Sequence, residues 1–438
     1  MAQRTRTLSD LEAAELRGRR VLVRVDYNVP LDDDRRITDP IRIEATLPTL
    51  RLLVDAGARV ILVSHLGRPD GAPDPAGSLA PVAAWLEDAT GWNVPLLTEA
   101  PGSSELATRV AGLEDGEVVL LENIRFFPGE TSNDPAFGTA LGELGDLFVG
   151  DAFGVAHRAH ASNVGAPTVI RAGGGTAVAG RLMEREIRFL RDTLRSPVRP
   201  FVSVMGGAKI SGKIDLIEAI LPTVDRLLVG GAMANTFLRA LGLDTGKSLV
   251  EEDRVQMAAD LLERGGDKIL LPVDVVVASE ISPSAQTRIV DRDDVGTDDR
   301  IGDIGPATRA LFASEIRGAG TVVWNGPMGV AELAPFAEGT FEIARILADA
   351  TDQGTLSVVG GGDSAAAAEA AGVAARMTHI STGGGASLDL MAGKELPGVS
   401  VLEVVDEVAD VDGDAPDDAP DEAPAQVRTG GSTDGGAR

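Results

Sequence analysis

The chain has 438 residues, of which 44% are hydrophobic, so it is long enough for two globular domains rather than one. It contains no cysteine, which excludes disulfides, thiolate metal sites and a cysteine nucleophile. The formal net charge of −27 argues against a nucleic-acid partner, because phosphate backbones attract basic surfaces. The sequence shows neither the apolar core of a signal peptide nor an apolar run long enough to span a membrane. We therefore expect a cytoplasmic protein with no membrane partner.

Lysine is rare in this chain. Only five of the 40 basic residues are lysines, at positions 209, 213, 247, 268 and 394, and the others are arginines. An acidic, lysine-poor surface is typical of adaptation to high salt, although a codon bias toward arginine would give the same ratio. Residues 406–438 are rich in Asp, Pro and Gly and poor in apolar residues, so we expect them to form a disordered acidic tail.

Short apolar runs alternate with helix-length segments along the chain. Such runs predict parallel strands that are covered by helices on both faces. There are too many of them for one doubly wound sheet, so we expect an α/β fold with two three-layer domains. The predicted strands lie within residues 20–27, 59–66, 117–123, 147–153, 201–206, 226–231, 268–278, 321–326, 355–361 and 377–382.

A glycine cluster at 173–175 precedes a long amphipathic segment, which we expect to be a hinge helix between the domains. The expected N-terminal domain covers residues 1–177 and the expected C-terminal domain covers residues 178–391.

Basic residues follow several strands in the first half of the chain. In open parallel sheets the ligand crevice lies at the carboxyl ends of the strands. A surface charge or an ion pair is the simpler explanation for any single arginine, but recurrence at five strand ends points to a pocket for a small anion such as a phosphate ester. The residues concerned are Arg24, Arg42, His65, Arg68, Arg125, His157, Arg158 and His160.

Two other features of this half have alternative interpretations. Asp26 and Asn28 are candidates to bind substrate hydroxyls, but "DYNVP" is also a favourable turn sequence. The segment "HRAH" (157–160) contains two possible metal ligands, but no cysteine or nearby carboxylate completes a usual set.

Four glycine-rich turns follow strands in the second half, at 205–209, 229–237, 358–371 and 381–391. Glycine allows backbone N–H groups to approach a phosphate, and a helix that begins there adds the positive end of its dipole. The stretch "VSVMGGAKISGKID" has nearly Walker A spacing, but Ile214 stands where the magnesium-binding hydroxyl belongs. If a helix begins in this turn, Lys209 and Lys213 lie one turn apart on the same face.

Three further segments have competing interpretations. "GGGDSA" (360–365) is close to a dinucleotide fingerprint, which keeps an oxidoreductase open, although no acidic residue for the ribose ends the next strand. Lys247 in "DTGKS" is interpreted as an ordinary loop lysine. The segment from Trp324 to Glu332 is either a rigid turn or a surface for a nucleotide base and ribose.

From about residue 8 to residue 404 the chain resembles the phosphoglycerate kinases. The resemblance rests on eight segments in the order and spacing of that family: "RVDYNVP", "SHLGRP", "LLENIRF", "DAFGVAHRAHAS", "GGAKISGKI", "WNGPMGVAE", "GGGDSAA" and "STGGGASLDL". It implies two Rossmann-like domains with parallel sheets, joined by a hinge. It also implies reversible, Mg²⁺-dependent phosphoryl transfer between ATP and the carboxylate of 3-phosphoglycerate, with ADP and 1,3-bisphosphoglycerate on the other side of the reaction.

The resemblance also implies roles for individual residues. The 3-phosphoglycerate site would comprise Asp26, Asn28, Arg42, His65, Arg68, Arg125 and Arg158. The nucleotide site would comprise Lys209, Lys213, Gly230, Gly231, Asn325, Gly326, Pro327, Glu332, Gly360, Gly361, Gly362, Asp363 and Ser364, with Asp363 serving Mg²⁺. Arg42, Lys209, Gly384 and Gly385 would surround the transferred phosphoryl group.

The same resemblance makes predictions about the hinge and the assembly. Glu186 and Lys394 match a hinge pair, and residues 392–405 would return to complete the N-terminal domain. We expect a monomer. A non-catalytic binding protein on this scaffold is the remaining alternative, but it would have lost charged site residues that are present here.

Overall fold

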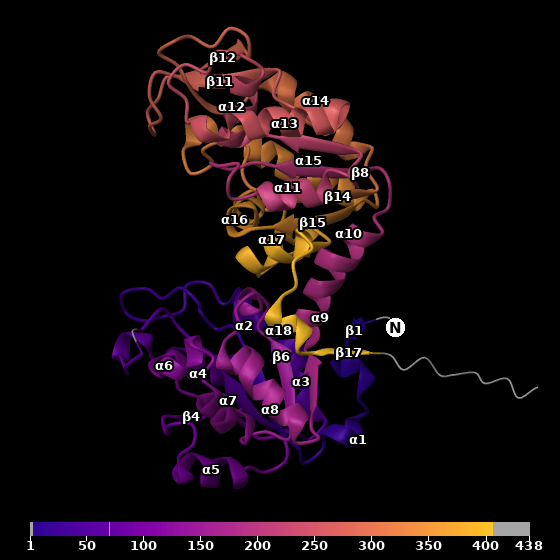
Figure 1. Cartoon of the computed structure of the whole chain (residues 1–438). Coiled ribbons are helices and arrows are strands. Elements are labelled where there is room, and N and C mark those ends of the chain that lie inside the picture. Colours follow the sequence, from indigo (N-terminus) through magenta and orange to yellow (C-terminus); the bar gives the residue numbers. More distant parts are fainter. Residues whose placement is uncertain (1–2, 70, 406–438) are drawn as a thin grey trace, which may run out of the picture.

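The structure is a computed structural model that describes residues 3–69 and 71–405. The predicted disordered tail, residues 406–438, lies outside the described residues. Each half of the chain builds one six-stranded sheet with helices on both faces, and Figure 1 shows the resulting two lobes. Within the described part of the chain, no helix is long and apolar enough to cross a membrane.

All strands of the N-terminal sheet are parallel, in the order β4-β5-β3-β2-β6-β7. Side chains alternate between its two faces: Leu22 packs on one side, and Val21 and Val23 pack on the other. The strands are β2 (Arg20–Val25), β3 (Arg59–Val63), β4 (Leu96–Leu97), β5 (Val118–Leu121), β6 (Leu147–Asp151) and β7 (Thr176–Ala179).

Helices cover both faces of this sheet. One face packs against α3 (Leu47–Asp55) and α4 (Ala80–Thr90), and the other packs against α5 (Ser104–Ala111), α7 (Pro135–Gly142) and α8 (Ala166–Ala172). Short helices complete the lobe: α1 (Ala13–Leu16), α2 (Ile41–Glu44) and α6 (Pro128–Thr131).

The C-terminal sheet repeats this plan in the order β10-β9-β8-β14-β15-β16, again with parallel strands only. Its strands are β8 (Phe201–Met205), β9 (Arg226–Val229), β10 (Ile269–Leu270), β14 (Thr321–Asn325), β15 (Leu356–Gly360) and β16 (His379–Ile380). Its helices are α11 (Ile214–Ile220), α12 (Gly231–Ala240), α13 (Val255–Gly265), α14 (Pro306–Arg317), α15 (Glu338–Asp352), α16 (Gly362–Ala370) and α17 (Gly385–Met391).

The predicted strand at 268–278 is wrong in one respect, because Pro272 divides it. The first part, β10, belongs to the large sheet, whereas β11 (Asp274–Ala278) pairs antiparallel with β12 (Arg288–Asp291) and β13 (Arg300–Ile304). Proline has no N–H to donate to a strand ladder, so a strand run that contains it tends to break there.

The hinge segment follows the N-terminal sheet directly. It comprises α9 (Arg181–Ile187), a π-helical turn (Arg188–Asp192) and α10 (Thr193–Arg195). Strand β7 lies between the glycine cluster and this segment and pairs with β6 through Ala179. The expected domain boundary after residue 177 therefore falls inside a strand of the N-terminal sheet.

The chain crosses back to the N-terminal lobe after α17. The short helix α18 (Pro397–Ser400) precedes β17 (Glu403–Val405), which pairs antiparallel with β1 (Gln3–Thr5). The last described residues of the chain thus lie beside its first strand.

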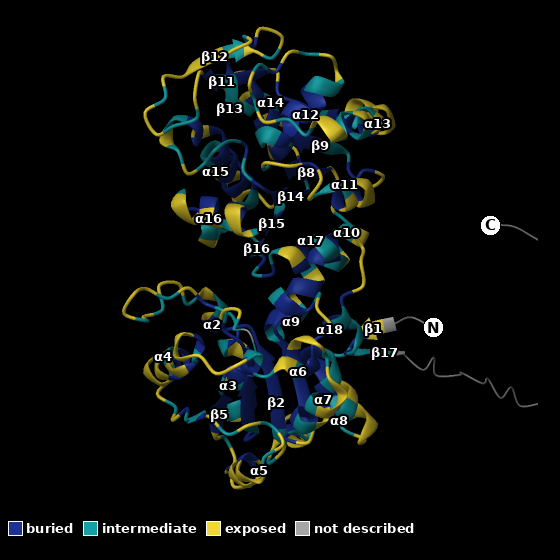
Figure 2. Ribbon diagram, turned by 60° about the vertical axis from the view of Figure 1, so that its left-hand side comes forward, coloured by how far each residue is buried: buried dark blue, intermediate teal, exposed yellow. Residues whose placement is uncertain are grey.

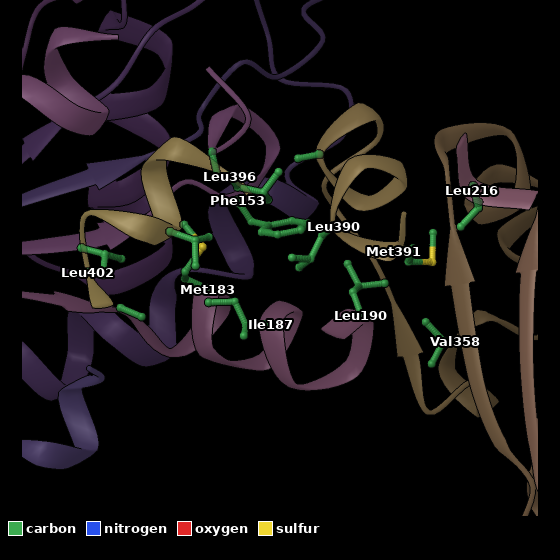
Figure 3. Packing of buried hydrophobic residues seen from close by; sticks show 14 of the residues in the cluster. Phe153, Met183, Ile187, Leu190, Leu216, Val358, Leu390, Met391, Leu396 and Leu402 are labelled. Atoms are coloured by element: carbon green, nitrogen blue, oxygen red, sulfur yellow. The ribbon is translucent and has the colours of Figure 1, made fainter. Parts of the chain in front are cut away.

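One apolar cluster runs through the hinge from lobe to lobe. Figure 3 shows Met183, Ile187 and Leu190 along the hinge segment, with Phe153 of the N-terminal lobe and Leu390 of α17 next to each other on one side of it. Burial of this continuous apolar surface stabilises the junction between the two lobes.

A buried carboxylate attaches the hinge helix to the C-terminal lobe. Glu186 accepts a hydrogen bond from Nε2 of His379 at 2.8 Å and two more from the N–H and the hydroxyl of Thr382, each at 2.8 Å. Lys394 instead pairs with Asp215 at 2.6 Å and with Asp389 at 3.1 Å. The expected pairing of Glu186 with Lys394 is therefore wrong in this structure.

Replacing Leu62, which is fully buried in the N-terminal core, should destabilise that lobe. Leu62→Ala leaves a cavity, so we expect the free energy of unfolding to fall by about 2–5 kcal/mol. Urea unfolding followed by circular dichroism measures the loss. Ile289→Ala is the control, because Ile289 on β12 is 58% exposed and its truncation should change stability by less than about 0.5 kcal/mol. Equal losses in both variants would contradict this description of the core.

Candidate active site

A basic cavity of about 570 Å³ lies at the carboxyl ends of the N-terminal strands. All seven residues predicted for the 3-phosphoglycerate site line it, together with His157 and His160. They come from segments spread over more than one hundred residues, and the parallel strand order brings them to one edge of the sheet. The predicted residues are Asp26, Asn28, Arg42, His65, Arg68, Arg125 and Arg158.

The cations in this cavity differ in how firmly the protein holds them. Arg42 donates to the carbonyl of Asn28 at 2.8 Å and lies 3.6 Å from the Asp26 carboxylate. Arg125 donates to the carbonyl of Gly67 at 2.8 Å. The exposed Arg68 and Arg158 side chains have no protein partner among the described residues, so their guanidinium groups are available to an anion.

Arg24 lies beneath the cavity rather than in its wall. Its side chain is 1% exposed, and burial lowers its pKa from the usual value, while the charges of Glu130 and Asp26 oppose that shift. The pKa of His65 lies well below its usual value because the ring is buried and Arg24 is close. His65 is therefore neutral at physiological pH, and the positive charge of the cavity comes from arginines.

A second cavity, of about 650 Å³, lies in the C-terminal lobe. Four residues of the predicted nucleotide site line it, namely Gly231, Pro327, Glu332 and Asp363. The opposite wall comes from the small antiparallel sheet and includes Val275, Arg300 and Ile301, which the sequence did not suggest. Lys247, interpreted as an ordinary loop lysine, also lines this cavity, and it pairs with Asp298 at 2.6 Å.

The glycine turns of this lobe pack closely against one another. A Cβ atom on Gly206 would lie 2.0 Å from the carbonyl oxygen of Pro327, and one on Gly231 would lie 2.6 Å from the backbone nitrogen of Gly207. A Cβ atom on Gly230 would lie 2.5 Å from Sδ of Met328, a flexible side chain that can move. Gly206 and Gly231 are thus required by the backbone contact between turns, whether or not a phosphate also approaches them.

Lys209 and Lys213 do not lie together on one helix, because no helix begins in the glycine turn after β8. Residues 206–213 form a loop, and α11 begins only at Ile214. Lys209 is exposed, whereas Lys213 donates to the carbonyls of Gly206 at 2.8 Å and Asn325 at 2.9 Å. Lys213 therefore joins the ends of β8 and β14.

Other residues predicted for the nucleotide site lie around the ends of β8 and β14 and do not line the cavity. The hydroxyl of Ser364 accepts a hydrogen bond from the N–H of Gly326 at 2.6 Å. The side-chain nitrogen of Asn325 is buried and has no partner in the described chain. Gly360 and Gly361 pack near that nitrogen, and Gly362 begins α16.

Helix α17 begins where the lobes meet. Gly384 has a positive φ of 49° and the helix starts at Gly385. A Cβ atom on Gly383 would lie 2.3 Å from the Phe153 ring, so the turn before this helix lies directly against the N-terminal lobe. The turn before α17 therefore lies beside Phe153 and Gly154, and Gly154 lines the basic cavity.

The residues present fit a magnesium ion that is bound mainly by a ligand's phosphates. In the described part of the chain, no group of three or more His, Asp or Glu residues is arranged to hold a metal. Asp363 presents one exposed carboxylate at the cavity. Mg²⁺ commonly takes one or two protein carboxylates together with substrate phosphates and water.

Comparison with known proteins identifies the family. The family model for phosphoglycerate kinase matches residues 11–394. The chain belongs to this family. A phosphoglycerate kinase from Chlorobaculum tepidum is 51% identical over 401 residues, which cover 91% of this chain and 99% of the relative. One from Chloroflexus aurantiacus is 52% identical over 402 residues, covering 91% and 98%.

Solved structures of the family share the fold. The phosphoglycerate kinase of Coxiella burnetii has a TM-score of 0.82 at 39% identity and covers 91% of this chain and 99% of its own. That of Pyrococcus horikoshii OT3 has a TM-score of 0.76 at 32% identity, covering 90% and 98%. The two-lobed arrangement in Figure 2, with a buried interior in each lobe, is thus the family's two-domain fold.

Lys213 should make stability depend on pH in the alkaline range. Burial lowers its pKa from 10.5 to about 8, although Asp363 opposes the shift. The unfolded chain then binds more protons between pH 8 and 10.5, so the contribution of this group to stability rises with pH over that window. Below about pH 8 Lys213 is charged in the folded protein, so burial of its ammonium group lowers the free energy of unfolding by its full amount.

Lys213→Met removes this titration and serves as the comparison. Urea unfolding at about pH 8 and about pH 10 measures the free energy of unfolding of both proteins. The value for the wild type minus the value for Lys213→Met should increase as the pH rises. A difference that stays constant would show that Lys213 keeps an ordinary pKa.

Proposed function

We propose that this protein transfers a phosphoryl group reversibly between Mg-ATP and the carboxylate of 3-phosphoglycerate. The observation that carries the proposal is the basic cavity, in which seven predicted ligand residues meet in an otherwise acidic chain. Membership of the phosphoglycerate kinase family supports the same reaction. This reaction belongs to glycolysis and gluconeogenesis.

The N-terminal cavity suits 3-phosphoglycerate. Arg68, Arg125 and Arg158 would hold its phosphate, since planar guanidinium groups match phosphate oxygens with paired hydrogen bonds. Asp26 would accept a hydrogen bond from its hydroxyl group, and the side-chain NH₂ of Asn28 would donate to its hydroxyl or carboxylate oxygens. Arg42, already fixed by a backbone carbonyl, would face the transferred group.

The C-terminal cavity suits the nucleotide. Its apolar wall, with Val275, Ile301 and Met328, would hold the base, and Glu332 would accept hydrogen bonds from the ribose. Asp363 would hold Mg²⁺, which when bound neutralises charge on the phosphates. Lys213 and the turn glycines would act indirectly, by fixing the strand ends around the phosphates.

The reaction itself requires no general base. The attacking carboxylate is ionised at neutral pH, so catalysis depends on positioning and on positive charge around the phosphoryl group. Lys209, Arg42 and the N–H groups at Gly384 and Gly385 would supply that charge from the protein. Each cavity is lined by one lobe only, so transfer requires the lobes to close about the hinge.

Several properties of the whole protein form part of this proposal. The N-terminal domain would extend to the start of the hinge helix and would include residues 392–405, and the C-terminal domain would end at residue 391. The protein would act as a cytoplasmic monomer whose acidic surface suits high salt.

A coupled assay with 3-phosphoglycerate and Mg-ATP tests the proposal. We expect turnover by the wild type and a decrease in kcat of at least about tenfold in Lys209→Ala, with little change in the KM for 3-phosphoglycerate. Absence of turnover would refute the proposed function. An unchanged kcat in the variant would remove Lys209 alone from its role.

Arg68→Ala should weaken substrate binding. Loss of one charged hydrogen bond is expected to cost about 1.5–3 kcal/mol of binding free energy. Calorimetric titration with 3-phosphoglycerate measures this, and the affinity for ATP is the internal control because the two cavities lie in different lobes. Unchanged affinity for 3-phosphoglycerate would contradict the assignment of the basic cavity.

A further inference from the structure

A chain of buried polar groups runs beneath the basic cavity. Its members are Glu130 on α6, Ser162 in the π-helical turn Ala161–Gly165, Arg24 on β2, and His65 just after β3. Each of these four residues is at most 2% exposed. A buried network of this kind strongly constrains the geometry of its members, because an unpaired buried polar group is costly.

The direction of each hydrogen bond follows from the donor chemistry. The hydroxyl of Ser162 donates to Glu130 at 2.7 Å, and its backbone N–H donates to the other carboxylate oxygen at 2.9 Å. The Ser162 oxygen is thereby oriented to accept from Nε of Arg24, at 2.7 Å. Reversal of this bond is impossible, since a guanidinium group has donors only.

Arg24 then determines the state of the histidine. Its Nη2 lies 3.3 Å from Nδ1 of His65, and its Nη1 donates to the carbonyl of Val25. Because Nη2 is a donor, Nδ1 of His65 must be the acceptor, so the ring proton sits on Nε2. The competing acceptor for a proton on Nδ1 is Asp26, but its oxygen is 3.8 Å away.

The remaining nitrogen of His65 is available to a ligand. His65 lines the cavity, and its Nε2 has no protein partner among the described residues. A neutral ring with its proton on Nε2 presents a donor, which suits an anion. The opposite tautomer would present a lone pair and repel the same anion.

We propose that Glu130 and Ser162 are positioning residues for Arg24. Held in this way, Arg24 fixes His65 as the neutral tautomer whose Nε2–H donates to the bound anion. The identity of that anion as 3-phosphoglycerate rests on the proposed function. The tautomer itself does not, because it is set in the ligand-free protein.

The first test is nuclear magnetic resonance of the histidine rings. The chain has only four histidines, so ¹⁵N-histidine labelling gives a simple spectrum, and loss of signals in His65→Asn assigns this ring. In the ligand-free wild type we expect Nε2 of His65 to carry the proton and Nδ1 to be unprotonated. A proton on Nδ1 would overturn the proposal.

Ser162→Ala is the main variant, because it removes the link to Arg24 and leaves the Glu130 charge in place. We expect a mixture of His65 tautomers and an increase of about threefold to tenfold in the KM for 3-phosphoglycerate. The KM for ATP should not change. Glu130→Gln should act in the same direction. One orientation of the amide places its NH₂ group against the backbone N–H of Ser162, and the other makes the Ser162 hydroxyl an acceptor, so that it no longer donates to residue 130.

Ser78→Ala is the matched control. Its hydroxyl also donates to a partly buried carboxylate, Glu122, at 2.7 Å, but neither residue lines the basic cavity. This variant should leave the tautomer and both KM values unchanged. An equal increase in KM in both serine variants, or an unchanged tautomer or KM in Ser162→Ala, would overturn the proposal. If the wild type shows no turnover, the proposed function fails, whereas the tautomer measurements still decide this inference.

Discussion

The candidate site depends on one constraint of parallel sheets, which is that the carboxyl ends of all strands meet at the same edge. In the N-terminal lobe this edge gathers charged side chains from segments as far apart as Asp26 and Arg158 into one cavity. In the C-terminal lobe it gathers glycine turns, which pack so closely that side chains would not fit between them. The same topology therefore has a different result in each lobe. In the N-terminal lobe it gathers charged side chains, and in the C-terminal lobe it brings backbone turns into close contact.

The hinge places these two edges near each other without joining the cavities. The apolar cluster in Figure 3 is continuous from one lobe to the other, so the two lobes share one buried interior at the hinge. Glu186 anchors α9 to the C-terminal lobe through His379 and Thr382, and a buried carboxylate that lost these partners would be strongly destabilising. Thr382 immediately precedes the turn into α17, so the hinge helix is directly connected to the turn that lies against Phe153 of the N-terminal lobe.

Much of the fold and the cationic site could be predicted from the sequence. The apolar runs revealed most strands because buried parallel strands are apolar throughout, and arginines stand out at their ends. The wall formed by β11 to β13 was missed, since Pro272 interrupts a run that otherwise looks like one strand. Glu130 and Ser162 were missed as well, because a buried polar pair from two distant segments leaves no local pattern. The environment of Lys213 was misjudged for the same reason.

The sequence by itself determined the alternation of strands and helices, the two sheets, the set of residues around the basic cavity and the family. These follow from local pattern, from strand direction and from motifs whose residue types are tied to phosphate chemistry. Only the tertiary structure decided which cations are free and which are held by carbonyls, that Lys213 joins two strand ends, and that Arg24 acts from beneath the cavity on His65. Such properties depend on distances between segments far apart in the chain, and hydrogen-bond direction and burial exist only once those segments have packed.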